Sequence, residues 1–167
     1  MEQHLNHRIL GIDPGSLRMG FGLIETTQDN PRLISQGVFR ANPKEDLQFR
    51  LYELFQLLRD QCQEWKPSVI AVEEPFVGVN VQSALAVVRA ETLVLLVAAS
   101  HGIKVARYAP SQVKQAVTGH GMAAKEQVRF MMSVILGTPE TIGLDAADAL
   151  GVAVCHAYSF RIDQLLK

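Results

Sequence analysis

The alternation of apolar and polar residues predicts three strands in the first quarter of the chain. Apolar runs cover Arg8 to Asp13, Gly20 to Glu25 and Leu33 to Ala41, with short polar turns between them. Strands joined by such short turns favour an antiparallel meander. Gly37 lies inside the third run, where we expect a bulge.

The rest of the chain alternates between helical spacing and short apolar runs. Leucines and a phenylalanine recur at helical spacing between Leu47 and Leu58, and buried strands are expected at Ser68 to Glu73 and Lys104 to Tyr108. Four further helices are expected at Ala84 to Ser100 (capped by Ser83 and ended by Gly102), at Pro110 to Val117, at Ala124 to Leu136 and from Asp145 onward. This order predicts an α/β fold, a mixed five-stranded sheet flanked by helices, in a single domain over residues 1–167.

The helix expected at Ala84 to Ser100 is apolar on nearly every side. Such a helix is either deeply buried or part of a subunit interface, and we favour the interface. Arg89 and Glu91 interrupt it, so no uncharged run approaches the roughly 20 residues of a membrane span. The polar first residues lack an apolar leader, and we therefore expect a cytoplasmic protein.

Composition excludes few functional classes. The chain is 48% hydrophobic and 20% charged, and its formal net charge is -1. A near-neutral chain has no global attraction for nucleic acid, so any such contact must depend on local basic patches. Cys62 and Cys155 fit no zinc or redox spacing and are expected to be free thiols.

Acidic residues stand where several predicted elements meet. Asp13 ends the first strand, and either Glu73 or Glu74 ends a strand that can pair parallel beside it. Strand side chains alternate, so these two glutamates face opposite sides, and spacing leaves the choice open. Asp145 and Asp148, three residues apart in an alanine-rich helix, share one helix face. Taken singly, Asp13 fits a role in a turn and Asp145 fits the start of a helix. A helix-start role explains Asp148 less well, because it lies further into the helix.

Converging carboxylates have a specific chemical use. Carboxylate oxygens bind hard divalent cations, and two such ions about 3.5–4 Å apart serve in-line phosphoryl displacement. One ion lowers the pKa of a bound water, and the other stabilises charge on the departing oxygen.

The ordered motifs resemble the RuvC family of Holliday junction resolvases, which have a ribonuclease H-like fold. Each motif is weak alone, but the ordered set is specific and covers nearly the whole chain. The matching segments are Ile9 to Ser16, Ala71 to Glu73 with Phe76, Gln112 to Gln115, Gly119 to Gly121, Lys125 to Val128 and Asp145 to Leu150.

The resemblance implies a homodimeric, magnesium-dependent endonuclease of recombination and repair, with two Mg²⁺ per subunit and Mn²⁺ able to substitute. It would cut four-way DNA junctions by paired symmetric nicks that leave 5′-phosphate and 3′-hydroxyl ends. A branch-migration motor of the RuvA and RuvB type is the implied partner. The catalytic and metal-binding acids carry over to Asp13, Glu73, Asp145 and Asp148, which favours Glu73 over Glu74.

DNA contacts are expected at five residues. Phe76 matches a loop aromatic that probes base pairs at the junction centre, and Lys114 and Lys125 match lysines near the cleaved strand. Arg89 and His120 are further candidates, His120 because two glycines make its segment a flexible link.

The chain also departs from the family pattern in two places. Val88 to Thr92 replaces a glycine-bearing family segment, and Glu74-Pro75 stiffens the loop before Phe76.

Three other functions compete with this interpretation. An actin-like phosphoryl-transfer domain needs a second subdomain, for which 167 residues leave no room. A non-catalytic junction-binding scaffold would be signalled by loss of an acid, and all four are present. A nuclease of the same fold that acts on RNA or RNA–DNA hybrids is disfavoured only by the lysine-bearing helices.

Overall fold

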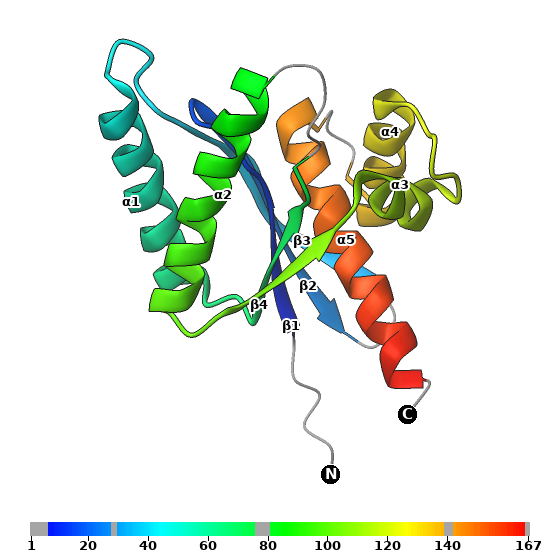
Figure 1. Ribbon diagram of the computed structural model, residues 1–167. Coiled ribbons are helices and arrows are strands. Elements are labelled where there is room, and N and C mark those ends of the chain that lie inside the picture. The colour runs from blue at the N-terminus through cyan, green and yellow to red at the C-terminus, as the bar shows by residue number, and fades with distance from the viewer. Residues whose placement is uncertain (1–6, 28–29, 76–80, 139–141, 166–167) are drawn as a thin grey trace.

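The computed structural model describes residues 7–27, 30–75, 81–138 and 142–165. Five strands form one sheet in the order β3-β2-β1-β4-β5, with helices on both faces (Figure 1). The strands are β1 (His7–Asp13), β2 (Arg18–Thr27), β3 (Asn30–Arg40), β4 (Val69–Glu73) and β5 (Lys104–Tyr108).

The pairing confirms the predicted mixed sheet. β1, β2 and β3 pair antiparallel as a meander, and β4 pairs parallel with both β1 and β5. The bulge expected at Gly37 is wrong, because the register shifts between Leu23 and Ile24 instead. Gly37 lies opposite Phe21, and a Cβ on Gly37 would come 2.9 Å from the Phe21 ring. The glycine therefore makes room for this ring.

The helices form two layers (Figure 1). α1 and α2 pack on one face of the sheet, and α5 packs on the other together with α3 and α4. The helices are α1 (Leu47–Trp65), α2 (Val81–Ser100), α3 (Pro110–Thr118), α4 (Lys125–Leu136) and α5 (Leu144–Leu165). Ser83 is not the cap of α2, because the helix begins at Val81 and already includes Ser83.

Strand alternation divides the core between these layers. Leu10 and Ile12 of β1 belong to the cluster under α1 and α2, whereas Ile9 belongs to the cluster under α5. Ile70 and Ala71 of β4 divide in the same way. Both strands are thus buried on two faces, which explains their continuous apolar sequences.

α5 lies unusually close to the sheet because glycines face it. A Cβ on Gly11 would overlap the carbonyl oxygen of Ala149, and one on Gly20 would overlap that of Asp145. Gly22 lies opposite Gly11 across the β1–β2 pair, and Gly20 lies opposite Asp13. The first turn of α5 is therefore held against the ends of the strands at Asp13.

α2 is not the deeply buried helix that was one of the two expectations. Only 28% of its most apolar window is buried within the described residues. Length and composition alone would let α2 cross a membrane, but this is weak evidence, since core helices of water-soluble proteins pass the same test. Glu91 of α2 is only 5% exposed, and its carboxylate pairs with Arg107 of β5 at 2.8 Å.

The glycine contact can be tested by adding one methyl group. We expect Gly11→Ala to lower the free energy of unfolding by about 2–3 kcal/mol, because the Cβ must push α5 off the sheet. Urea denaturation measures the change. Gly143→Ala is the matched control, because nothing in the described part of the chain lies within 4 Å of its added Cβ. An equal loss in both variants would contradict the contact.

Candidate active site

Four carboxylates converge at one edge of the sheet. β1 and β4 run parallel as neighbours, so Asp13 and Glu73 end them at the same edge. The first turns of α5 bring Asp145 and Asp148 there. The pKa of the Asp13 carboxyl rises to about 7, mainly through burial and then through the charges of Asp148, Glu73 and Asp145. The structure thus brings together all four acids that the sequence singled out.

The choice between Glu73 and Glu74 follows from the two faces of β4. Val69 and Ala71 pack toward α5, and by alternation Glu73 shares that face. Burial and the charge of Asp148 raise the pKa of Glu73. Glu74 is exposed, and its backbone N–H donates to the carbonyl oxygen of Tyr108 at 2.8 Å.

Two lysines supply positive charge from α3 and α4. The Lys125 ammonium donates to Asp148 at 3.0 Å, and this hydrogen bond is the main reason that its pKa is raised. Its charge opposes the upward pKa shifts of Asp13 and Glu73, and Lys114 opposes the shift of Glu73. Both predicted lysines therefore act on the carboxylates electrostatically.

Side-chain amides set the starts of these two helices. The Gln112 amide oxygen accepts from the backbone N–H of Ala109 at 2.8 Å, and that of Gln127 accepts from Ala124 at 2.9 Å. Each bond satisfies a backbone donor at a helix start. The bond from Ala124 fixes the backbone just before Lys125.

Arg18 is a site residue that the sequence interpretation missed. Its guanidinium Nη2 donates to Asp145 Oδ2 at 2.5 Å. Arg18 lies two residues before Gly20 on β2, so both face α5. Strand alternation alone indicates which face of β2 Arg18 occupies. Its pairing with Asp145 follows only once α5 is placed on that face.

The donor set fits a hard divalent cation. Four carboxylates offer only oxygen ligands, and their mutual repulsion leaves negative charge that two side-chain cations offset only in part. Within the described residues, no three acidic, histidine or cysteine side chains form a ready-made ligand group. Asp145 and Asp148 each engage a side-chain cation through Oδ2, namely Arg18 and Lys125, so these cations share the acids that a metal ion would bind.

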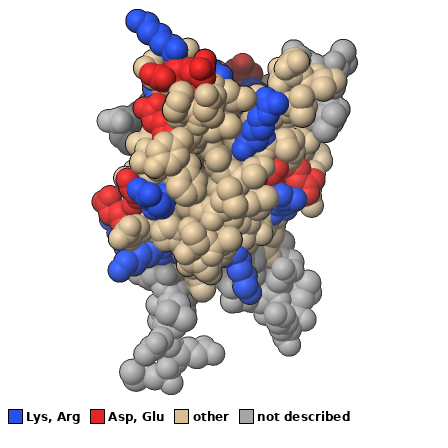
Figure 2. Space-filling model, turned by 60° about the vertical axis from the view of Figure 1, so that its left-hand side comes forward, with Lys and Arg blue, Asp and Glu red and all other residues tan. Residues whose placement is uncertain are grey.

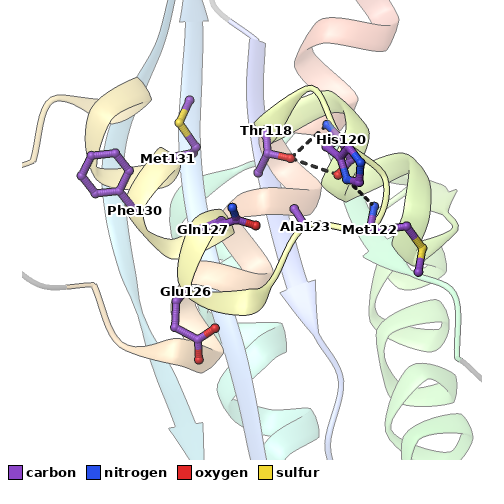
Figure 3. Close-up of a pocket in the computed structure, with 8 residues that line it drawn as sticks. All are labelled: Thr118, His120, Met122, Ala123, Glu126, Gln127, Phe130 and Met131. Atoms are coloured by element: carbon purple, nitrogen blue, oxygen red, sulfur yellow. Dashed lines mark hydrogen bonds between the residues drawn. The ribbon is translucent and has the colours of Figure 1, made fainter.

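A cavity of about 620 Å³ lies beside α4 and the turn before it. Figure 3 shows its lining residues, which include none of the four acids: Thr118, His120, Met122, Ala123, Glu126, Gln127, Phe130 and Met131. The cavity is therefore separate from the carboxylates, although its wall adjoins Lys125.

The turn at His120 is held by hydrogen bonds, unlike the flexible link that its glycines predicted. The Thr118 hydroxyl contacts both the backbone N–H and the carbonyl oxygen of His120 at 3.1 Å. The His120 Nδ1 accepts from the backbone N–H of Met122 at 3.2 Å (Figure 3). This bond leaves Nε2 to carry the ring proton of a neutral His120.

Of the two remaining candidates, Phe76 and Arg89, the structure describes only Arg89. Phe76 lies outside the described residues. Arg89 is exposed on α2, which covers the face of the sheet opposite α5. The departing segment Val88 to Thr92 also belongs to α2, where it holds the buried Glu91.

Sequence comparisons match nearly the whole chain. The family model described as crossover junction endodeoxyribonuclease RuvC matches residues 9–156. A protein of that name from Desulforamulus reducens is 45% identical over 150 residues, which are 89% of this chain and 92% of the relative. One from Syntrophomonas wolfei is 40% identical over 161 residues, 96% of this chain and 94% of the relative.

Solved structures share the fold. Thermus thermophilus RuvC in complex with a Holliday junction substrate gives a TM-score of 0.88 at 34% identity, covering 94% of this chain and 96% of that chain. The yeast mitochondrial Holliday junction resolvase gives 0.61 at 14% identity, covering 96% and 86%, and at this identity it supports the fold alone. The ribonuclease H-like fold expected from the motifs is confirmed.

The burial of Asp13, together with the charges of the neighbouring acids, predicts a pH-dependent stability in the absence of metal. Its carboxyl pKa is about 7 in the folded protein against the ordinary 3.8, so the folded state binds more protons between these values and loses stability as pH rises through them. In EDTA, Asp13→Asn should therefore be more stable than wild type at pH 8, by up to about 4 kcal/mol.

This gain should shrink toward pH 4, and urea denaturation across the pH range measures it. Asp60→Asn is the control, because it removes a carboxylate that is 59% exposed on α1, on the opposite face of the sheet from α5. A gain in Asp13→Asn that is independent of pH would contradict the raised pKa of the Asp13 carboxyl.

Proposed function

This chain belongs to the RuvC family of crossover junction endodeoxyribonucleases, and from that membership we propose that it resolves four-way DNA junctions by paired symmetric nicks. The cuts leave 5′-phosphate and 3′-hydroxyl ends that a ligase can join, as recombination and repair require. The observation that carries the proposal is the meeting of Asp13, Glu73, Asp145 and Asp148 at one edge of the sheet. The catalytic unit is one domain over residues 1–167.

The four acids are proposed to hold two Mg²⁺ ions, with Mn²⁺ able to replace them. When bound, such ions supply an activated water and stabilise charge on the departing oxygen. Asp13 would hold such ions together with the other three acids, whose charges all act on its carboxyl. Its crowding is relieved by positive charge, which favours the ionised form that a ligand needs.

Lys125 is proposed to steady the scissile phosphate. Its ammonium is shared with Asp148 and stays protonated, because the surrounding carboxylates raise its pKa. A fixed cation beside the reacting phosphorus offsets the charge that develops on phosphate oxygens in the transition state. Lys114, whose charge reaches Glu73, extends the positive surface along the same strand of DNA.

Three further DNA contacts are proposed, at His120, Arg89 and Phe76. His120 is exposed and its Nε2–H, fixed by the Met122 bond, is available to donate to a backbone phosphate. Arg89 is proposed to contact junction arms, and Phe76 to probe base pairs at the junction centre. These contacts compensate for a chain whose net charge of -1 gives no general attraction to DNA.

The apolar face of α2 is proposed to hold a second copy of the chain. Spacings of four and three residues place Val81, Leu85, Val88, Thr92, Leu95 and Ala99 on one exposed seam. This repeat is the one that packs helices together. Figure 2 shows the face formed by α1 and α2, whose centre lacks charged residues.

Other proposed features follow the family. A homodimer presents two active sites to the two continuous strands of a junction, which suits symmetric nicks. A branch-migration motor of the RuvA and RuvB type is proposed to deliver the junction, in the bacterial cytoplasm where the chromosome lies.

Cleavage of a synthetic four-way junction tests the function. In Mg²⁺ the wild type should make paired nicks in the junction and spare linear duplex, and EDTA should abolish them. Glu73→Gln should lose cleavage by about 10²-fold or more while junction binding survives, because it removes a charge that the metal and the transition state need. Gel analysis of labelled strands measures both properties.

Glu74→Gln is the matched control, because Glu74 is exposed and lies one residue beyond the end of β4, and it should cleave as wild type does. Equal loss in both variants would contradict the site. Junction binding without cleavage in any divalent metal would support a scaffold protein instead, and equal cutting of duplex would refute the substrate.

The interface predicts a second pair of variants. Val88→Glu buries a charge in the seam and should weaken dimerisation by roughly 30-fold or more, as measured by analytical ultracentrifugation. Val134→Glu on α4 is the control, because it makes the same change outside the seam at a residue of similar exposure. Val134 is 56% exposed and Val88 is 42% exposed. A dimer unchanged by Val88→Glu would exclude the seam as the interface.

A further inference from the structure

We propose that Arg18 competes with the divalent cation for Asp145 and thereby lowers the metal affinity of the carboxylate group. The inference rests on the proposed function, which places the cation at the four acids. It concerns a residue outside that acid set, on β2, whose guanidinium occupies one oxygen of a proposed ligand.

Backbone packing places Asp145 near both Asp13 and Arg18. The Asp145 carbonyl oxygen lies so close to Gly20 that a Cβ there would overlap it. Asp13 lies opposite Gly20 on the neighbouring strand, and Arg18 lies two residues before Gly20, on the same face. The Asp145 carboxylate can therefore turn toward Asp13 and a shared cation, or toward Arg18, to which it is bonded at 2.5 Å.

Arg18 and Lys125 act on different parts of the site. The charge of Lys125 influences Asp13 and Glu73 as well as Asp148. Arg18 is not among the charges that shift the pKa of Asp13 or Glu73. Its direct contact with the acids is the bond to Asp145 Oδ2, so removing it should change one proposed ligand first.

The pair is weak enough to be displaced. The side chains of Arg18 and Asp145 are 53% and 28% exposed, and ion pairs open to water contribute little because solvent screens them. A divalent cation carries twice the charge of the guanidinium and can bind several carboxylates at once. The cation therefore displaces Arg18 from Asp145. Because the ion pair must be broken, the apparent affinity of the carboxylate group for the cation is lower.

Direct binding of Mn²⁺ tests this without DNA or turnover. Electron paramagnetic resonance of free Mn²⁺ gives the affinity of wild type, Arg18→Gln and Arg40→Gln. Arg40 is the register partner of Arg18 on β3 and forms no ion pair with any residue in the described ranges. Both substitutions remove one positive charge from the same region, but only Arg18→Gln removes a direct bond to Asp145.

We expect Arg18→Gln to bind Mn²⁺ about three- to tenfold more tightly, and Arg40→Gln to differ from wild type by less than about twofold. In an Asp145→Asn background, Arg18→Gln should bring no further gain, because the competing contact is already lost. Equal gains in both arginine variants, or unchanged or weaker binding in Arg18→Gln, would overturn the inference.

A second measurement needs no variant of Arg18. Crystals of the wild type with Mn²⁺ should show the Asp145 carboxylate on the ion and Arg18 released from it. An intact Arg18–Asp145 pair beside a bound ion would overturn the competition while leaving the proposed function standing. Failure of the wild type to bind Mn²⁺ at all would instead refute the proposed metal site, and the inference with it.

Discussion

The close contact of α5 with the glycines of β1 and β2 is the constraint on which the rest of the structure depends. Gly11 and Gly20 allow helix backbone where a side chain would normally stand. Because Gly20 is the partner of Asp13, this contact also decides where Asp145 lies. Helix and strand contribute carboxylates to one point only because no side chain separates them.

That arrangement has an electrostatic cost in the absence of metal. Burial and three neighbouring carboxylates disfavour the ionised form of Asp13, and Lys125 and Arg18 offset only part of the repulsion through Asp148 and Asp145. A group with surplus negative charge attracts cations. The same two side-chain cations that stabilise the metal-free protein therefore oppose metal binding, and their exposure keeps this opposition small.

The sequence was informative where chemistry follows from local spacing. Helical and strand periods predicted every described element, and Asp145 and Asp148 shared a face by their spacing alone. The local pattern could not select Glu73 over Glu74, because strand alternation puts the two side chains on opposite faces without saying which face meets α5. Arg18 was missed for a related reason: its partner lies 127 residues away, and only tertiary packing joins them. Ser83 failed as a cap because the helix starts earlier.

Strand alternation also separates the proposed cleavage site from the proposed subunit interface. Residues of β1 and β4 that face α5 lead to the carboxylates, whereas their neighbours Ile12 and Val72 face the layer that contains α2. A second copy bound at the α2 seam therefore has the whole sheet between it and the acids of the same chain. Such a partner would leave this site open to DNA, and it would act on cleavage by positioning a second site. Loss of the seam should then abolish the pairing of nicks before it abolishes the chemistry of a single nick.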